Sequence, residues 1–308
     1  MTRTKRRSAG ILAILAFTVA MIGCANSVTA TSDELAPHRL HEIRATKRVV
    51  SPDSRRPVIA LVLGGGGLRG FAHVGAIRAL EEAGFKPTIV VGTSAGAVVG
   101  AAYASGLGPD QIQLATQDVK ISSLMDFTLS SSGLIRGNNL AKWIGSVTQD
   151  VPIESFPIRF AAVATDLNSG QPVSIDQGSA GRAIQASSAV PGVNVPVAYG
   201  AGYLVDGGVT SLVPVRFARA MGADIVIAVE IYCHGPRTDG ISIPAVLGNV
   251  MRTQSCLVAA PEMAEADLLI APTITVPGIA AKEAQAAVVQ AGYEAARVAL
   301  ETWRPDAG

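Results

Sequence analysis

Short apolar runs alternate with segments of helical periodicity along most of this chain. Runs typical of buried strands lie at residues 57–63, 89–91, 158–166, 203–206, 224–230 and 267–271. The spacing of apolar positions predicts helices over residues 71–83, 109–120, 138–148, 180–187, 214–221, 243–266 and 280–303. Because strands and helices alternate, the pattern predicts an α/β fold in residues 57–308, a three-layer α/β/α sandwich around a largely parallel central sheet.

The first 23 residues follow a different pattern. Residues 1–7 are basic, residues 9–23 are almost wholly apolar, and Cys24 follows. This layout is typical of a secretory signal peptide, and the 15 apolar residues fall short of the roughly 20 that span a bilayer. Residues 21–24 also resemble a bacterial lipobox, apart from Met21 in place of the usual leucine, which implies cleavage before Cys24 and a lipid on its sulfur. An ordinary signal peptide and an uncleaved anchor are the alternatives.

Residues 24–56 are polar, mixed in charge and without a lasting period, so we expect them to tether the domain to a membrane surface. His38 and His41 lie in this segment and are expected to be solvated linker residues rather than ligands. Ala25 rather than aspartate follows the cysteine, which by analogy with Gram-negative sorting favours an exported protein anchored to the outer membrane. A soluble periplasmic or secreted protein is the alternative.

The strand at residues 89–91 runs into Gly92-Thr93-Ser94-Ala95-Gly96, a G-x-S-x-G motif, and an alanine-rich helix follows. In a nucleophile elbow this motif holds the serine on a tight strand-to-helix turn, where a Cβ at either glycine would collide with a neighbouring element. Ser94 would then lie at a helix N-terminus, whose free amides favour developing negative charge. The context favours a nucleophilic Ser94 over a chance serine in a glycine-rich turn.

A run of glycines, residues 64–67, follows the strand at residues 57–63, and Leu68-Arg69-Gly70 comes next. The run contains a G-x-G-x-x-G match, but the next strand delivers Ser94 instead of the acid that a dinucleotide site needs. A Walker loop is excluded because no Lys-Ser/Thr pair follows. Anion binding by backbone amides remains, so next to a nucleophilic Ser94 we expect the glycine run to form an oxyanion hole, with Arg69 adding charge or bracing the loop.

A carboxylate stands at a second strand end, in Asp206-Gly207-Gly208, where the glycines allow a serine and its substrate to approach the acid. A Ser-His-Asp triad would need a histidine after the acid, and His234 is the one histidine there. His73, in the helix after the glycine run, is expected to be a packed structural residue. The other features favour a dyad in which Asp206 itself is the base.

Three blocks in this order, residues 64–70, 92–96 and 206–208, resemble those of the patatin-like phospholipases. Shorter stretches similar to the bacterial branch lie at residues 164–167, 186–192 and 291–296, and the resemblance runs from about residue 57 to the end of the chain. It implies a patatin-like fold and hydrolysis of phospholipid or other lipid esters, with Ser94 as nucleophile, Asp206 as base and the Gly65–Gly67 amides as oxyanion donors. A Ser-His-Asp esterase using His234 and a non-catalytic lipid-binding envelope protein are the rival interpretations.

Composition narrows the expected partners. The chain is 49% hydrophobic and 16% charged, and its formal net charge of +1 gives no sign of nucleic-acid binding. Its His, Cys and carboxylate residues lack metal-ligand spacing, so we expect no metal and no other cofactor. The expected partners are a lipid ester and, through Cys24, a membrane surface. Cys233 and Cys256 form an even pair that could be joined in an exported protein or stay as two thiols.

Overall fold

The computed structural model describes residues 34–43, 57–117, 119–200, 202–237, 239–275 and 282–303. The predicted signal peptide and Cys24 lie outside these residues.

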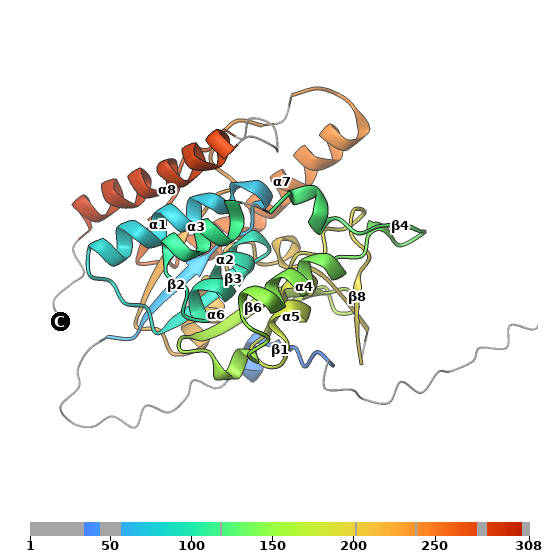
Figure 1. Ribbon diagram of the computed structural model, residues 1–308, viewed down its shortest axis with the longest axis horizontal. Coiled ribbons are helices and arrows are strands. Elements are labelled where there is room, and N and C mark those ends of the chain that lie inside the picture. Colours follow the sequence, from blue (N-terminus) through green and yellow to red (C-terminus); the bar gives the residue numbers. More distant parts are fainter. Residues whose placement is uncertain are drawn as a thin grey trace, which may run out of the picture. The chain divides into compact units, whose positions relative to one another are not determined.

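A nine-stranded sheet forms the centre of the described part of the chain (Figure 1). Its main path runs β1 (His38–Arg39), β7 (Gln171–Ile175), β6 (Arg159–Asp166), β3 (Ile89–Thr93), β2 (Ile59–Leu63), β10 (Ile225–Val229) and β11 (Leu268–Ile270). The strands from β6 to β11 are parallel, whereas β7 and β1 run antiparallel at one edge. Two further strands, β8 (Val197–Tyr199) and β9 (Gly202–Asp206), join antiparallel, β9 to β6 and β8 to β9.

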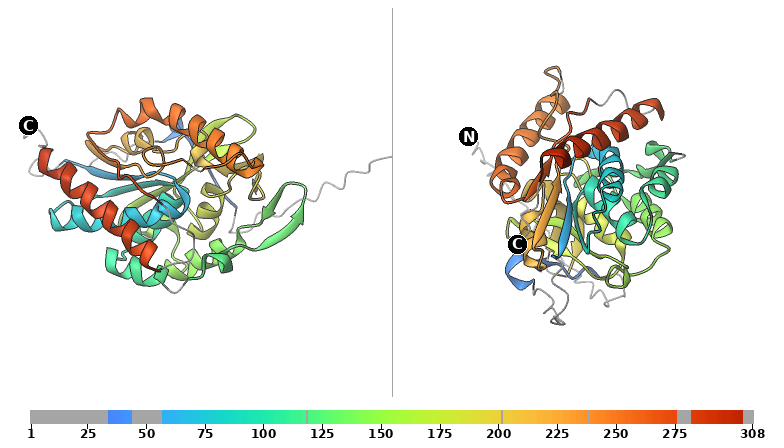
Figure 2. Two further views of the ribbon diagram at one scale, coloured as in Figure 1. Left: turned by 90° about the horizontal axis from the view of Figure 1, so that it is seen from above. Right: turned by 90° about the vertical axis from the view of Figure 1, so that its left-hand side faces the viewer.

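Helices cover both faces of this sheet (Figures 1 and 2). The helices are α1 (Phe71–Glu82), α2 (Ala95–Ala104), α3 (Pro109–Gln117), α4 (Asn138–Val147), α5 (Ala180–Ser187), α6 (Val215–Ala220), α7 (Ile243–Met263) and α8 (Lys282–Thr302). The described residues also form five short 3-10 turns, η1 (Leu40–Glu42), η2 (Gly67–Gly70), η3 (Ile121–Leu124), η4 (Ile153–Ser155) and η5 (Gly207–Val209). A small separate hairpin pairs β4 (Phe127–Ser130) with β5 (Gly133–Ile135).

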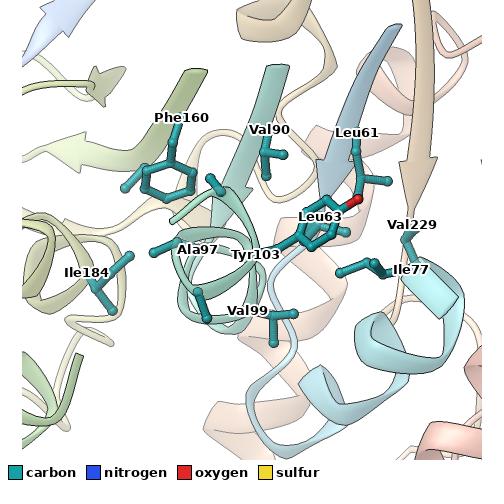
Figure 3. Close-up of a cluster of buried hydrophobic side chains, with 14 of the residues drawn as sticks. Leu61, Leu63, Ile77, Val90, Ala97, Val99, Tyr103, Phe160, Ile184 and Val229 are labelled. Carbon is teal, nitrogen blue, oxygen red and sulfur yellow. The ribbon is translucent and has the colours of Figure 1, made fainter. Parts of the chain in front are cut away.

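The core divides into two layers because successive side chains of a strand point to opposite faces. Leu61, Leu63 and Phe160 belong to a buried cluster shared with α1, α2, α5 and α8, part of which Figure 3 shows. Val62 and Val163, at intervening positions, belong to a second cluster that includes residues of α6 and α7. Strands buried on both faces are continuous apolar runs, which explains why run length located them in the sequence. The prediction of a three-layer sandwich with a largely parallel sheet is confirmed.

Part of the segment that we expected to be a tether is packed on the domain. Leu35 is buried, His38–Arg39 pairs with β7, and Leu40 and Ile43 pack against the second core cluster. The outer edge of β7 would otherwise present unpaired backbone groups, and β1 covers them. For residues 34–43, the expectation of a free tether is therefore wrong.

A disulfide joins Cys233, in the loop after β10, to Cys256 in α7, with 5.6 Å between the two Cα atoms. The sequence left this pairing open. The bond fixes the loop after a central strand to the helix that covers the second face of the sheet.

The contact between α1 and α8 depends on two glycines. A Cβ at Gly75 would lie 1.9 Å from Val289 O, and one at Gly292 would lie 1.9 Å from Ala72 O. Gly75→Ala should therefore force the helices apart and lower the free energy of unfolding by about 1–3 kcal/mol, the usual cost of overpacking. Urea denaturation measures this change. Gly248→Ala is the matched control, since a Cβ there meets no atom within 4 Å. An equal effect of both substitutions would contradict the close α1–α8 contact.

Candidate active site

Ser94 occupies a strained turn between β3 and α2. Its backbone has φ 52° and ψ −120°, a left-handed φ that non-glycine residues rarely adopt. The flanking glycines allow this turn, because a Cβ at Gly96 would lie 2.0 Å from Leu63 O and one at Gly92 would lie 2.5 Å from Gly96 O. Such strain persists where the surroundings fix it, and it is common at functional sites.

Two side chains fix the backbone of the turn. The Ser94 amide donates to Ser187 Oγ at 2.9 Å, and that hydroxyl donates in turn to Val163 O at 2.6 Å. The Thr93 hydroxyl donates to Ser211 O at 2.8 Å. This role of Ser187 could not be predicted from the sequence, because a serine at the end of a predicted helix carries no signal for a contact 93 residues away.

Strand β6 brings Asp206 to Ser94. The first part of β6 pairs with β3, with Thr93 opposite Val163. Strand β9 pairs with the next residues on the same edge of β6, so that Asp206 lies opposite Ala164. The last residue of β3 and the last residue of β9 thus meet at adjacent positions on one strand. This placement explains how two residues more than 100 positions apart come together at the carboxyl end of β3.

Asp206 is 7% exposed, and its carboxylate receives two hydrogen bonds. One comes from the Ser94 side chain, and the Gly208 amide supplies the other at 2.7 Å. Burial raises the pKa of Asp206 to about 6, against the lowering effect of both hydrogen bonds. A carboxylate with this pKa is a stronger base than an ordinary aspartate and remains mostly ionised at neutral pH.

The glycine run passes beside this pair, and its amides are not equivalent. Gly64 donates to Val229 O at 2.9 Å and Gly65 donates to Leu212 O at 3.0 Å. The expectation that Gly65 is an oxyanion donor is therefore wrong in this conformation, since its amide already has an acceptor. Among the described residues, the amides of Gly66 and Gly67 have no backbone acceptor. These two remain as candidate donors.

His73 braces the start of the glycine run. It is fully buried, and its Nε2 lies 2.8 Å from Gly64 O. Burial lowers the pKa of His73 to about 4, so the ring is neutral at physiological pH and can donate from Nε2 to this carbonyl. This arrangement is that of a packed structural residue.

Arg69 lies at the rim of the site next to an aromatic ring. Its guanidinium is 5.5 Å from the centroid of Tyr232, and the guanidinium of Arg252 is 5.4 Å from the same centroid. Burial lowers the pKa of Arg69, and the positive charge of the nearby Arg252 lowers this pKa further. Arg252 is held by the carbonyls of Pro236 and Gly235, at 2.6 and 3.0 Å. The structure thus places the Arg69 guanidinium against the Tyr232 ring, in the lining of a cavity that contains Ser94 and Asp206.

His234 contacts a different carboxylate. Its Nδ1 lies 2.5 Å from Oε2 of the fully buried Glu230, and its backbone amide also points to Glu230. The side chain of His234 is 53% exposed, and the residue lines neither of the two cavities that reach Ser94. The structure therefore does not bring His234 to the Ser94–Asp206 pair.

Two cavities meet at Ser94. One, of about 350 Å³, is lined almost entirely by apolar side chains such as Val98, Leu140 and Trp143. The other, of about 320 Å³, contains Asp206, Arg69 and Tyr232. Ser94, Gly67 and Leu68 belong to both. A bound molecule with an apolar end and a polar end could therefore place the bond between them at the Ser94 hydroxyl.

Comparison with known proteins identifies the family. The family model described as patatin-like phospholipase matches residues 61–219, which contain the glycine run, Ser94 and Asp206. The chain belongs to the patatin-like phospholipase family.

Named relatives share part of the chain. An uncharacterized NTE family protein of Mycobacterium tuberculosis is 37% identical over 180 residues, covering 58% of this chain and 50% of the relative. A lysophospholipase of Aspergillus fumigatus is 33% identical over 181 residues, covering 56% of this chain and 12% of the relative. The chain thus spans about half the length of the mycobacterial relative and a smaller share of the fungal one.

A solved structure supports the fold. The crystal structure of VipD from Legionella pneumophila superposes with a TM-score of 0.56 at 15% identity, covering 90% of this chain and 72% of that chain. The likeness confirms the patatin-like α/β architecture.

Proposed function

We propose that this protein is a serine hydrolase of lipid esters, of the phospholipase A or lysophospholipase type. The observation that carries the proposal is the hydrogen bond from the Ser94 side chain to the buried Asp206 carboxylate, on a strained elbow between two cavities. Membership of the patatin-like phospholipase family supports it. A relative named as a lysophospholipase supports the same class of substrate.

The proposed chemistry is a two-step acyl transfer through a Ser-Asp dyad. Asp206 accepts the Ser94 proton while Ser94 Oγ attacks the ester carbonyl, and the amides of Gly66 and Gly67 hold the resulting oxyanion. Collapse of the intermediate expels the alcohol, which takes the proton from Asp206. Water then attacks the acyl-enzyme, Asp206 accepts its proton, and the fatty acid leaves as Ser94 recovers its hydrogen.

The two cavities fit the two ends of such a substrate. The apolar cavity, with Val98, Leu140 and Trp143 in its wall, suits an acyl chain. The second cavity, with Arg69 and Tyr232, suits the polar remainder of the ester. This division orients the scissile bond at Ser94.

The dyad predicts a clear ranking of three variants. Ser94→Ala and Asp206→Asn should each lower kcat/KM by about 10⁴-fold or more, the scale of losing a nucleophile or its partner acid. His234→Ala should leave the rate near the wild-type value, since His234 contacts Glu230 instead. Steady-state hydrolysis of a lysophospholipid measures all three, with circular dichroism as the control for folding. A loss of about 10³-fold in His234→Ala would favour the triad esterase.

The raised pKa of Asp206 predicts a pH profile. The base works in its ionised form, so kcat/KM should be high above the pKa of about 6 and fall about tenfold per pH unit below it. An imidazole base would titrate in a similar range, so the profile is measured in His234→Ala as well as in the wild type. An unchanged midpoint in both proteins is expected. A midpoint that disappears with His234 would contradict an aspartate base.

The glycine run predicts a rate defect that can be reversed. A Cβ at Gly66 would lie 2.8 Å from Cδ1 of Ile231, which is fully buried, so Gly66→Ala should displace the loop and its amides. Loss of one oxyanion donor lowers kcat by about 10²–10³-fold, with little change in KM. Adding Ile231→Ala removes the obstructing atoms and should restore part of the rate. A Gly66→Ala enzyme with normal kcat and raised KM would contradict the oxyanion role.

We also propose that the protein is exported and lipid-anchored at the cell envelope. The basic and apolar start, Gly23-Cys24 and the disulfide between Cys233 and Cys256 support this location, since disulfides persist in oxidising compartments. Residues 25–33 would then connect Cys24 to the packed segment 34–43 of the folded domain. An anchor raises the local concentration of enzyme at a lipid surface without new contacts.

The anchor is tested by a single substitution. Cys24→Ser should abolish lipid attachment and leave either the full-length precursor or a soluble product, and the soluble product should move from the detergent phase to the aqueous phase in a Triton X-114 partition. Intact-mass spectrometry of the mature wild-type protein should show a diacyl or triacyl cysteine at its N-terminus. An unmodified Cys24 in the mature protein would contradict the lipoprotein proposal while leaving the hydrolase proposal intact.

A further inference from the structure

Helix α7 presents an apolar face outward. Its exposed large side chains are Ile243, Val246, Leu247, Val250, Leu257 and Val258. Four of these positions, 243, 247, 250 and 257, follow the spacing of one helical face. Ile241, just before the helix, is 94% exposed, and Leu257 is 69% exposed. A helix of a globular domain normally turns such a row of apolar side chains toward the core. We refer to the exposed apolar side chains of α7 as the apolar stripe.

The opposite face of α7 is fixed to the domain, so the apolar stripe cannot rotate inward. Cys256 is joined to Cys233, and Arg252 is buried against the carbonyls of the loop after β10. Ala259 and Met263 belong to the second core cluster. The outward orientation of the stripe is therefore a property of the fold.

The stripe lies next to the entrance of the site. Met251 and Ser255, on the same helix, line the cavity that contains Asp206 and Ser94. At the apolar cavity, Ile135 of β5 is a wall residue, and the hairpin around it exposes Phe127 and Leu129. Figures 1 and 2 show this hairpin and one end of α7 on the same side of the molecule. Each cavity at Ser94 thus has an element with exposed apolar side chains beside it.

Charge and area distinguish between the partners that could cover the stripe. The charged residues within α7, Arg252 and Glu262, are both buried, so the exposed face of the helix is neutral and, apart from Gln254, predominantly apolar. A helix of this length is about 30 Å long, and one face about 10 Å wide gives roughly 300 Å². A stable protein interface needs roughly 800 Å² from each partner, so a second copy of the chain is a poor match. No helix among the described residues is long and apolar enough to cross a membrane.

We propose that the outer face of α7 is an interfacial docking surface that lies in the outer part of a lipid bilayer and delivers lipid esters to Ser94. This inference rests on the proposed lipid ester hydrolase function. Interfacial helices bury an apolar face at the boundary of headgroups and acyl chains without crossing the bilayer. Docking through α7 places the cavity with Met251 and Ser255 against the source of the substrate.

A site-specific probe tests the docking. In the full-length Cys24→Ser chain, Leu247→Cys introduces a free thiol, since Cys233 and Cys256 are joined, and a nitrobenzoxadiazole label on it reports its surroundings. Vesicles of phosphatidylcholine should shift the label's emission to the blue. The matched control is Val298→Cys, at a 58% exposed position on α8, and it should show no shift. Absence of a shift at position 247, or equal shifts at both positions, overturns the proposal. A blue shift that appears without vesicles when the protein concentration is raised would mean that a second copy of the chain covers α7. This result would also overturn the proposal.

Kinetics provide the second arm. The double variant Leu247→Gln/Leu257→Gln should lower hydrolysis of vesicle phospholipid about tenfold or more, because two large apolar side chains leave the interface. Hydrolysis of soluble 4-nitrophenyl butyrate should stay near the wild-type rate, and Val298→Gln should change neither rate. Equal losses on both substrates, or no loss on vesicles, overturns docking through α7. If the wild type hydrolyses neither ester, the proposed function fails, whereas the labelling result still decides the docking.

Discussion

The hydrogen bond between the Ser94 side chain and the Asp206 carboxylate depends on strand β6, which pairs with two strands along one edge. The first part of this edge pairs with β3, and the last part pairs with β9. The ends of those two strands carry Ser94 and Asp206, so the ladder of β6 sets their separation. Val163 takes part twice, as the ladder partner of Thr93 and as the acceptor for Ser187, which holds the Ser94 amide. Close packing at Gly207, whose Cβ would lie 2.3 Å from Val163 O, completes the arrangement.

This arrangement stabilises two unfavourable features. The left-handed φ of Ser94 costs on the order of 1–3 kcal/mol. Burial disfavours the ionised form of Asp206 and raises its pKa to about 6. The surrounding strands are apolar on both faces and buried in two core clusters, which offset these costs. A rigid sheet therefore holds a strained serine and a desolvated carboxylate in contact. Both features are useful to a nucleophile and its base, and neither would persist on a mobile loop.

Much of the fold and of the candidate site could be predicted from the sequence, because the signals were local. Buried strands are apolar runs, Gly96 marks a turn that no Cβ could enter, and an acid before two glycines at a strand end marks Asp206. What the sequence could not supply depends on contacts between distant segments. The Gly65 amide is occupied by Leu212 O, Ser187 supports the elbow from another helix, and residues 34–43 cover the edge of β7. In α7 the apolar period predicted the helix, but the disulfide and Arg252 decide which face it turns outward.

The central claim is that Asp206 activates Ser94 for nucleophilic attack, and covalent labelling tests it most directly. A fluorophosphonate reacts with an activated serine and leaves a mass increment that peptide mapping assigns to one residue. The account predicts a single adduct on Ser94, with a labelling rate that falls as the pH drops through about 6 and is lost in Asp206→Asn. An adduct on another serine, or labelling of Ser94 at the wild-type rate in Asp206→Asn, would contradict it.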